Sequence, residues 1–296
     1  MNDRLNQLAL FVRTVEAGSF SKAAREFGLT QPSVSRAIAS LEARLGVTLL
    51  HRTTRRLTPT DVGQALVLSA RDALAAIDEA ESAARGADLL SGVLRVSLPT
   101  AFGVRQVIPH LPGFLALRPA LKIELMMSDR YEDLVAEGAD LALRLGDQPD
   151  SAFLTRKLAS AARVIVASPE YLNRRGVPVT VADLADHDCL GGPANAVREL
   201  WTFQRGGRSE KAAIEVRVRT GSGAGVVACA VSGLGVAMAS TWMCEQELRD
   251  GRLVQILRDY VLEPIDAHVV FPSGRRAPRK ARAFSDYLSA ALNAKP

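Results

Sequence analysis

The sequence predicts an α/β protein in which a small, basic helical domain precedes a long helix and a larger domain of alternating strands and helices. Three observations support this order. Residues 21–45 have the pattern of a helix, a glycine turn and a second helix. The net positive charge is concentrated at the N-terminus, and strand and helix patterns alternate beyond Gly92.

The helix-turn-helix follows from side-chain spacing. In the first helix we expect Ala23, Ala24 and Phe27 to face a core, and Gly28 to end the helix because glycine adopts a left-handed turn at little cost. Thr30 can cap the second helix, and the proline at its start lacks an amide that would have no helical partner there. Spacings of four, three and four predict the buried stripe of this helix: Val34, Ile38, Leu41 and Leu45.

The opposite face of the second helix carries small or hydrogen-bonding side chains. Such a face can enter the major groove of DNA, because small residues let the backbone approach the base edges while Gln, Ser and Arg bond to bases or phosphates. An ordinary helical hairpin with a solvated face is the alternative. The charge favours DNA: residues 1–60 hold nine Lys and Arg against four Asp and Glu, whereas residues 61–296 hold 28 of each sign.

Residues 46–58 predict two short strands around a basic tip, which together form a wing. Its arginines would lie beside the DNA backbone or the minor groove. The expected DNA contacts of the helices and the wing are Ser21, Gln31, Pro32, Ser33, Ser35, Arg36, Arg52, Arg55 and Arg56.

The segment from Leu8 to Gly63, with AxxFGLTQPSVSRAIASLEARLG and then LTPTDVG, resembles the winged helix-turn-helix of the LysR-type transcriptional regulators. The resemblance implies a sequence-specific DNA-binding regulator whose activity a small-molecule effector modulates. It also implies three parts: a winged helix-turn-helix DNA-binding domain at 1–59, a linker and dimerisation helix at 60–88, and an effector-binding regulatory domain at 89–296.

Residues 60–87 predict an Ala-rich helix, roughly 40 Å long at about 1.5 Å per residue. Thr60 caps it, and Asp61 complements its dipole. Its apolar stripe consists of Val62, Leu66, Ala73, Ile77, Ala80 and Ala84. The helix could fold back onto its own chain. The resemblance instead implies antiparallel pairing with a second copy, which gives a dimer or a tetramer with two recognition helices per pair.

Beyond Gly92 the pattern predicts an α/β sheet with mostly parallel strands. The resemblance implies two lobes of the periplasmic-binding type. Lobe I, at about 92–162 and 268–296, is expected to hold strands at 93–98, 122–127, 140–145 and 268–271 and helices at 102–117, 131–137 and 279–292. Lobe II, at about 163–267, is expected to hold strands at 163–167, 215–219 and 236–239 and a helix at 223–231.

Ligands of such sheets bind outside the carboxyl ends of the strands, near helix N-termini with free amides. The expected effector contacts lie at those ends and in one loop: Thr100, Ser128, Arg144, Gly146, Pro193, Asn195, Thr220 and Ser222. Thr100 and Ser222 could instead be helix caps, and Arg144 could be paired structurally. These groups suit a polar or anionic metabolite, while Trp201 and Phe203 could contact an aromatic effector or pack in a core.

Two other readings explain less of the chain. In an enzyme, the loop GSGAG at 221–225 would bind a dinucleotide, but Val226 occupies its sixth position. His187-Asp188-Cys189 lacks a nucleophile elbow or a partner motif. A solute-binding protein for transport would not explain the basic N-terminal domain.

The three cysteines, Cys189, Cys229 and Cys244, form neither a paired framework nor a CxxC motif. We expect buried thiols, with redox sensing as the alternative, and no metal or cofactor. No signal-peptide pattern is present, and the longest apolar run, 226–239, is shorter than a membrane span. We therefore expect a cytoplasmic, non-enzymatic protein that acts without a membrane. Its expected partners are double-stranded promoter DNA, the effector, its own copies and RNA polymerase.

Overall fold

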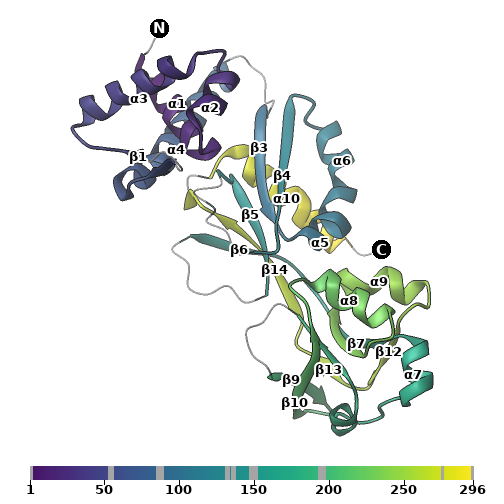
Figure 1. Ribbon diagram of the computed structural model, residues 1–296. Helices are drawn as coiled ribbons and strands as arrows, with labels where there is room; N and C mark the ends of the chain where they lie inside the picture. The colour runs from purple at the N-terminus through teal and green to yellow at the C-terminus, as the bar shows by residue number, and fades with distance from the viewer. Residues whose placement is uncertain are drawn as a thin grey trace.

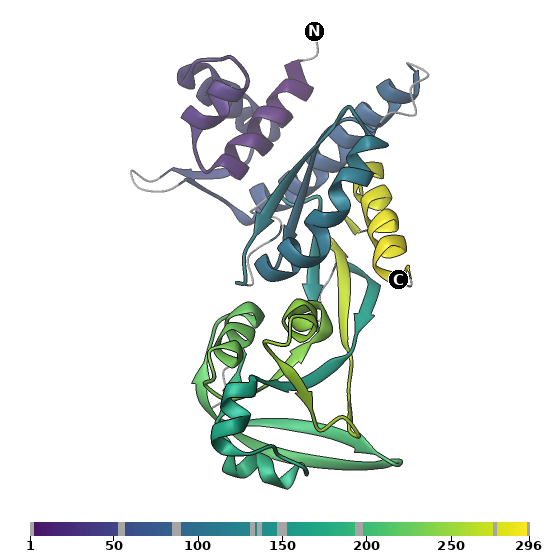
Figure 2. The ribbon, with the colours of Figure 1, turned by 90° about the vertical axis from the view of Figure 1, so that its right-hand side faces the viewer.

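The computed structural model describes residues 3–52, 57–84, 90–130, 134, 138–146, 153–192, 198–274 and 277–294. Three bodies follow one another along its length: a helical head at the N-terminus, then lobe I, then lobe II (Figure 1). The long helix α4 (Asp61–Ala84) leads from the head past lobe I (Figure 2).

The head is built from three helices, a two-stranded wing and the first turns of α4. Its other elements are α1 (Asp3–Ala17), α2 (Phe20–Glu26), α3 (Gln31–Leu45), β1 (Leu50–Arg52) and β2 (Leu57–Pro59). The strands pair antiparallel, as expected for the wing. Phe11 of α1 and Ile38 and Leu41 of α3 are fully buried in the core between the helices. Helix α1 was not among the predicted elements.

Most of the predicted helix-turn-helix is confirmed, and two of its side chains are not. Gly28 has a φ of +64° at the turn, and Val34 is fully buried like the two residues that follow it on the stripe. The expected burial of Phe27 and Leu45 is wrong, because they are 43% and 41% exposed. Phe27 lies after the last residue of α2, and Leu45 is the last residue of α3, so neither faces the neighbouring helices.

Helix α4 packs one face into the head core, including Leu66 of the predicted stripe, and leaves three residues of that stripe exposed. Val67 and Ala70 are buried in the head core, whereas Val62 is 52% exposed and Ala73 and Ala80 are exposed as well. Folding back onto its own chain therefore accounts for only one face of this helix.

Lobe I contains a five-stranded sheet in the order β4-β3-β5-β14-β6. Its strands and closing helix are β3 (Gly92–Leu98), β4 (Leu121–Met127), β5 (Leu141–Leu145), β6 (Leu154–Ala161), β14 (Ile265–Phe271) and α10 (Arg279–Asn293). Strand β3 is parallel to β4 and β5, whereas β14 is antiparallel to both of its neighbours. The late strand β14 thus returns to this lobe, as the resemblance implied.

The single helix expected at 102–117 is broken into four short segments. They are α5 (Thr100–Phe102), the π-helical η1 (Gly103–Val107), the 3-10 helix η2 (Ile108–His110) and α6 (Leu111–Ala116). Pro109 and Pro112 lack the amide that a continuous α-helix requires, which explains the breaks near them. Most of the helix expected at 131–137 lies outside the described residues.

Lobe II contains a seven-stranded sheet in the order β12-β7-β11-β8-β10-β9-β13. Its strands are β7 (Arg163–Ala167), β8 (Cys189–Gly191), β9 (Arg198–Arg205), β10 (Arg208–Arg219), β11 (Val236–Ser240), β12 (Val254–Ile256) and β13 (Val261–Leu262). Its helices are α7 (Pro169–Arg175), the 3-10 helix η3 (Ala182–Asp186), α8 (Gly223–Val231) and α9 (Thr241–Arg249).

The strand pairing of lobe II is mixed. Parallel pairs join β8 to β10 and β11, and the remaining pairs are antiparallel. The expectation of mostly parallel strands is therefore wrong for the two lobes together. The β9–β10 hairpin was not predicted, although the strand expected at 215–219 is the end of β10, and β9 also pairs with β13.

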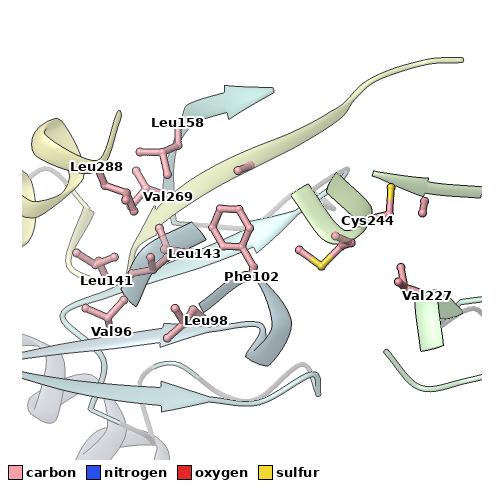
Figure 3. Close-up of a cluster of buried hydrophobic side chains, with 14 of the residues drawn as sticks. Val96, Leu98, Phe102, Leu141, Leu143, Leu158, Val227, Cys244, Val269 and Leu288 are labelled. Carbon is pink, nitrogen blue, oxygen red and sulfur yellow. The ribbon is translucent and has the colours of Figure 1, made fainter. Parts of the chain in front are cut away.

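One hydrophobic cluster continues from lobe I into lobe II. Phe102 lies between aliphatic side chains of lobe I and Cys244 of lobe II (Figure 3), and its ring meets Trp242 of α9 edge to face at 5.2 Å. Beside it, Arg105 donates hydrogen bonds of 2.9 and 2.7 Å to the two carboxylate oxygens of Glu247. This ion pair holds the pKa of Glu247 below its usual value. Apolar packing and a charged clamp therefore join the lobes.

The close approach of α4 to the wing strand can be tested at Gly63. A Cβ at this position would lie 2.1 Å from the backbone oxygen of Leu49. We expect Gly63→Ala to lower the free energy of unfolding by about 1–3 kcal/mol, since the backbone must move. Gly223→Ala is the control, because its added carbon would meet Met243 at an ordinary 3.7 Å, and it should be neutral or stabilising. Denaturation followed by circular dichroism compares the two, and equal stabilities would contradict this packing.

Candidate functional site

The N-terminal half of α3 presents a polar face to solvent. Thr30 caps the helix as expected: its hydroxyl oxygen accepts a hydrogen bond from the backbone N–H of Ser33 at 3.4 Å. The predicted DNA contacts on this helix are exposed or half-buried: Gln31, Pro32, Ser33, Ser35 and Arg36. They lie on the first two turns of one helix, which is the arrangement of helices that enter a major groove.

The remaining predicted DNA contacts lie on α2 and the wing. Ser21 is exposed in the first turn of α2, and Arg52 is the last residue of β1. Arg55 and Arg56, which were predicted to contact DNA, lie outside the described residues.

A carboxylate that sequence analysis did not single out connects α3 to the wing. Glu42 Oε1 accepts hydrogen bonds from the backbone N–H of Leu49 at 2.8 Å and of Leu50 at 3.2 Å. The hydroxyl of Thr60, which also caps α4, donates to the carbonyl of Thr48 at 2.9 Å. The helix and the wing therefore form one hydrogen-bonded unit. In the sequence, Glu42 looks like any solvated residue of a helix, because its partners lie beyond the helix end.

A cavity of about 420 Å³ lies between the lobes. The predicted effector contacts that line it are Ser128, Arg144 and Ser222. Those that do not line it are Thr100, Gly146 and Thr220, whereas their chain neighbours Pro99, Ala101, Leu145 and Gly221 do. Pro193 and Asn195 lie outside the described residues.

Local hydrogen bonds explain why some predicted side chains do not line the cavity. The hydroxyl of Thr220 donates to the carbonyl of Ser222 at 2.7 Å and closes the turn before α8. The backbone N–H of Gly146 donates to Asp266 at 2.8 Å across the sheet. Ser222 has both roles considered for it, since it lines the cavity and its Oγ accepts the N–H of Gly225 as the cap of α8.

The cavity wall carries three guanidinium groups, from Arg130, Arg144 and Arg163. Arg144 is buried, and its Nη2 donates to Ser97 Oγ at 3.2 Å. Within the parts of the chain that the structure describes, no carboxylate forms an ion pair with Arg130 or Arg163. Sequence analysis selected only the middle one of these arginines.

The two carboxylates of the wall have partners of their own. Glu199 accepts hydrogen bonds from Arg219 at 2.6 Å and from the indole N–H of Trp201 at 3.2 Å. Asp129 accepts the backbone N–H of Thr100 at 3.1 Å. The positive charge of the wall is therefore only partly balanced.

The rest of the lining is largely apolar. It includes Phe102 from lobe I and Trp201, Val226, Met238 and Met243 from lobe II. Phe203, the other aromatic residue considered for the effector, is fully buried in the core of lobe II instead.

The cysteines and the histidine considered for redox sensing or catalysis are buried or half-buried. Cys189 and Cys244 are buried, and burial raises their pKa values to about 12 and about 11, so both are thiols at neutral pH. Cys229 is half-buried. The Nδ1 of His187 lies 3.1 Å from the hydroxyl of Tyr171. In the described segments we find no cluster of metal-ligating side chains and no helix that could span a membrane.

Family models match both parts of the chain. The model for bacterial regulatory helix-turn-helix proteins of the lysR family matches residues 5–64, and that for the LysR substrate binding domain matches residues 87–293. An uncharacterized HTH-type transcriptional regulator of Haemophilus influenzae is 34% identical over 285 residues, which cover 96% of this chain and 99% of that protein. The HTH-type transcriptional regulator PtxR of Pseudomonas aeruginosa is 34% identical over 299 residues, which cover 99% of this chain and 94% of PtxR.

Solved structures extend the similarity over both lobes. CrgA, a LysR-type transcriptional regulator from Neisseria meningitidis, superposes with a TM-score of 0.62 at 29% identity, covering 97% of this chain and 98% of CrgA. The Vibrio cholerae virulence activator AphB gives a TM-score of 0.58 at 28% identity, with coverage of 97% and 98%. The chain therefore belongs to the LysR family, and it is a transcriptional regulator with a helix-turn-helix that binds DNA and a C-terminal domain that binds a small-molecule effector.

Proposed function

We propose that the first two turns of α3 bind base edges in the major groove while Ser21 and the wing arginines Arg52, Arg55 and Arg56 bind the backbone. The exposed, polar N-terminal half of α3 is the observation that carries this proposal. The division into a DNA-binding domain at 1–59, a linker helix at 60–88 and an effector domain at 89–296 belongs to the same proposal. Contact with RNA polymerase stays a prediction from the family resemblance.

Arg36 is exposed on α3 opposite the buried stripe, so it is the side chain to test for base contact. We expect Arg36→Ala to weaken binding by about 1–3 kcal/mol and to relax the preference at one base position. The measurement is a titration on duplexes that the protein itself selects from a random-sequence pool. Arg258→Ala, on an exposed loop of lobe II, is the matched control. Unchanged affinity and preference for the Arg36 variant would contradict the assignment of this face.

We propose that the open stripe of α4 pairs antiparallel with the same helix of a second copy. An exposed apolar stripe on a 24-residue helix favours burial against a partner, and a twofold pair would present two α3 helices to a two-part DNA site.

Substitutions on the stripe test this pairing. Light scattering of the wild type at micromolar concentration should give at least twice the 31.7 kDa mass of the chain. The combined variant Ala73→Glu and Ala80→Glu should shift the mass toward the monomer, because four carboxylates would meet in the interface. Ala73→Ser with Ala80→Ser keeps small side chains and should stay dimeric. A monomeric wild type that still bound a two-part site would overturn the proposal.

We propose that the effector is a small anion with an apolar body and that it is released unchanged. Arg130 and Arg163 supply positive charge and form no ion pair with a described carboxylate, and Arg144 adds a buried guanidinium. Phe102, Val226 and their neighbours supply the apolar wall. Guanidinium groups bind carboxylates through strong, charge-assisted hydrogen bonds.

Three probes with the same ring separate charge from shape: phenylacetate, phenylacetamide and phenethylammonium. Calorimetric titration of the full chain should show phenylacetate binding about tenfold or more tighter than the other two. Arg163→Gln should remove most of this difference, and Arg163→Lys should retain part of it. Equal binding of the acid and the amide, or preference for the cation, would contradict an anionic effector without affecting the DNA-binding proposal.

A further inference from the structure

A buried carboxylate joins the head to lobe I. Glu16, near the end of α1, has a side chain that is only 5% exposed. Its Oε1 lies 2.8 Å from Arg71 Nη2 on α4. Its Oε2 lies 3.0 Å from Arg13 Nη1 on its own helix and 3.5 Å from Arg95 Nη1 on β3 of lobe I. A carboxylate removed from water needs such partners, so its contacts stabilise one arrangement of the three elements.

Lobe I also approaches this cluster with its backbone. A Cβ at Gly138, in the turn before β5, would lie 2.9 Å from Arg71 Nη2 and 2.9 Å from the carboxylate carbon of Glu16. A side chain here would have to displace Arg71 or Glu16, and the φ of +78° favours glycine as well. The cluster is therefore enclosed by the head, by α4 and by lobe I together.

Strand β3 connects this cluster to the effector cavity. Side chains at alternate positions point to the same face of a strand, so Arg95 and Ser97 share one face of β3. The hydroxyl of Ser97 accepts a hydrogen bond from Arg144, which lines the cavity. Arg95 also donates a hydrogen bond to Glu124 of β4 at 3.0 Å, but this carboxylate is 52% exposed, so the pair contributes little to the position of Arg95. A ligand that moves Arg144 thus acts on Ser97, which is two residues along β3 from Arg95 and its contact with Glu16 of the head.

We infer that Glu16 and Arg95 are positioning residues that set the orientation of the DNA-binding head on lobe I and couple it to the effector cavity. Neither residue lines the cavity, and neither is among the proposed DNA contacts. In a dimer the orientation of each head decides whether both α3 helices can reach their half-sites together. The inference therefore rests on the proposed dimer but not on the proposed effector.

Arg95→Gln is the variant of choice, because Glu16 keeps Arg13 and Arg71 and remains paired. We expect this variant to bind a two-part duplex, selected by the wild type from a random pool, about fivefold or more weakly. Binding to a duplex with a single half-site should not change, since α3 itself is untouched. Glu124→Gln removes the other partner of Arg95 within lobe I and is the matched control, with both affinities unchanged within about twofold.

A distance measurement tests the same contact without DNA. Spin labels at Lys22→Cys on the head and Lys122→Cys on lobe I, both exposed positions, should give a narrow distribution in a Cys229→Ser background. Arg95→Gln should broaden it, and Glu124→Gln should not. An unchanged distribution in the Arg95 variant, or equal losses on both duplexes, would overturn the inference. If the wild type bound both duplexes equally well but Arg95→Gln still broadened the distance distribution, only the proposed dimer would be contradicted.

Discussion

The arrangement of the effector domain depends on two very short chain segments that connect its two sheets. Strand β6 ends at Ala161 and β7 begins at Arg163, so a single residue separates the lobes at the first crossing. The return crossing, from β13 to β14, is almost as short. Arg163 and Ile265, which begin the strands after the two crossings, both line the cavity. The two chain crossings therefore border the cavity, and any change in the angle between the lobes must occur about these crossings.

Contacts beside the cavity stabilise the angle between the lobes that the structure shows. Phe102 packs against α9, and Arg105 pairs with Glu247 beside it. Because the pair lowers the pKa of Glu247, the charged form persists at neutral pH, and the contact weakens as the pH falls through that lowered pKa. Phe102 also lines the cavity, so a ligand that moves its ring changes the same contact. A ligand can shift the angle only by its difference in affinity for the two arrangements.

Sequence patterns predicted the features that depend on neighbouring residues, such as helix ends and buried faces. The bounds of α8 follow from periodicity and its cap and are confirmed, and so is the buried stripe of α3 apart from Leu45. The helix expected at 102–117 failed because prolines inside an apolar stretch still break the hydrogen-bond ladder. Contacts between distant residues have no local signature: Arg105 and Glu247 are 142 residues apart, and Arg163 looked like the first residue of an ordinary strand. Sequence reasoning therefore located the cavity from strand ends but missed two of its three arginines.

The hydrogen bonds between Glu42 and the wing show that the two halves of α3 have different roles. The second half of α3 holds the wing and the core through Glu42, Ile38 and Leu41, while Gln31 and Arg36 in the first half are exposed. Substitutions in the first two turns can therefore change the preferred base sequence with little loss of folding stability. After a gene duplication, such a head could diverge toward a new promoter while its scaffold stayed the same. The fold therefore does not fix the DNA sequence that the protein prefers, and this preference can change during evolution.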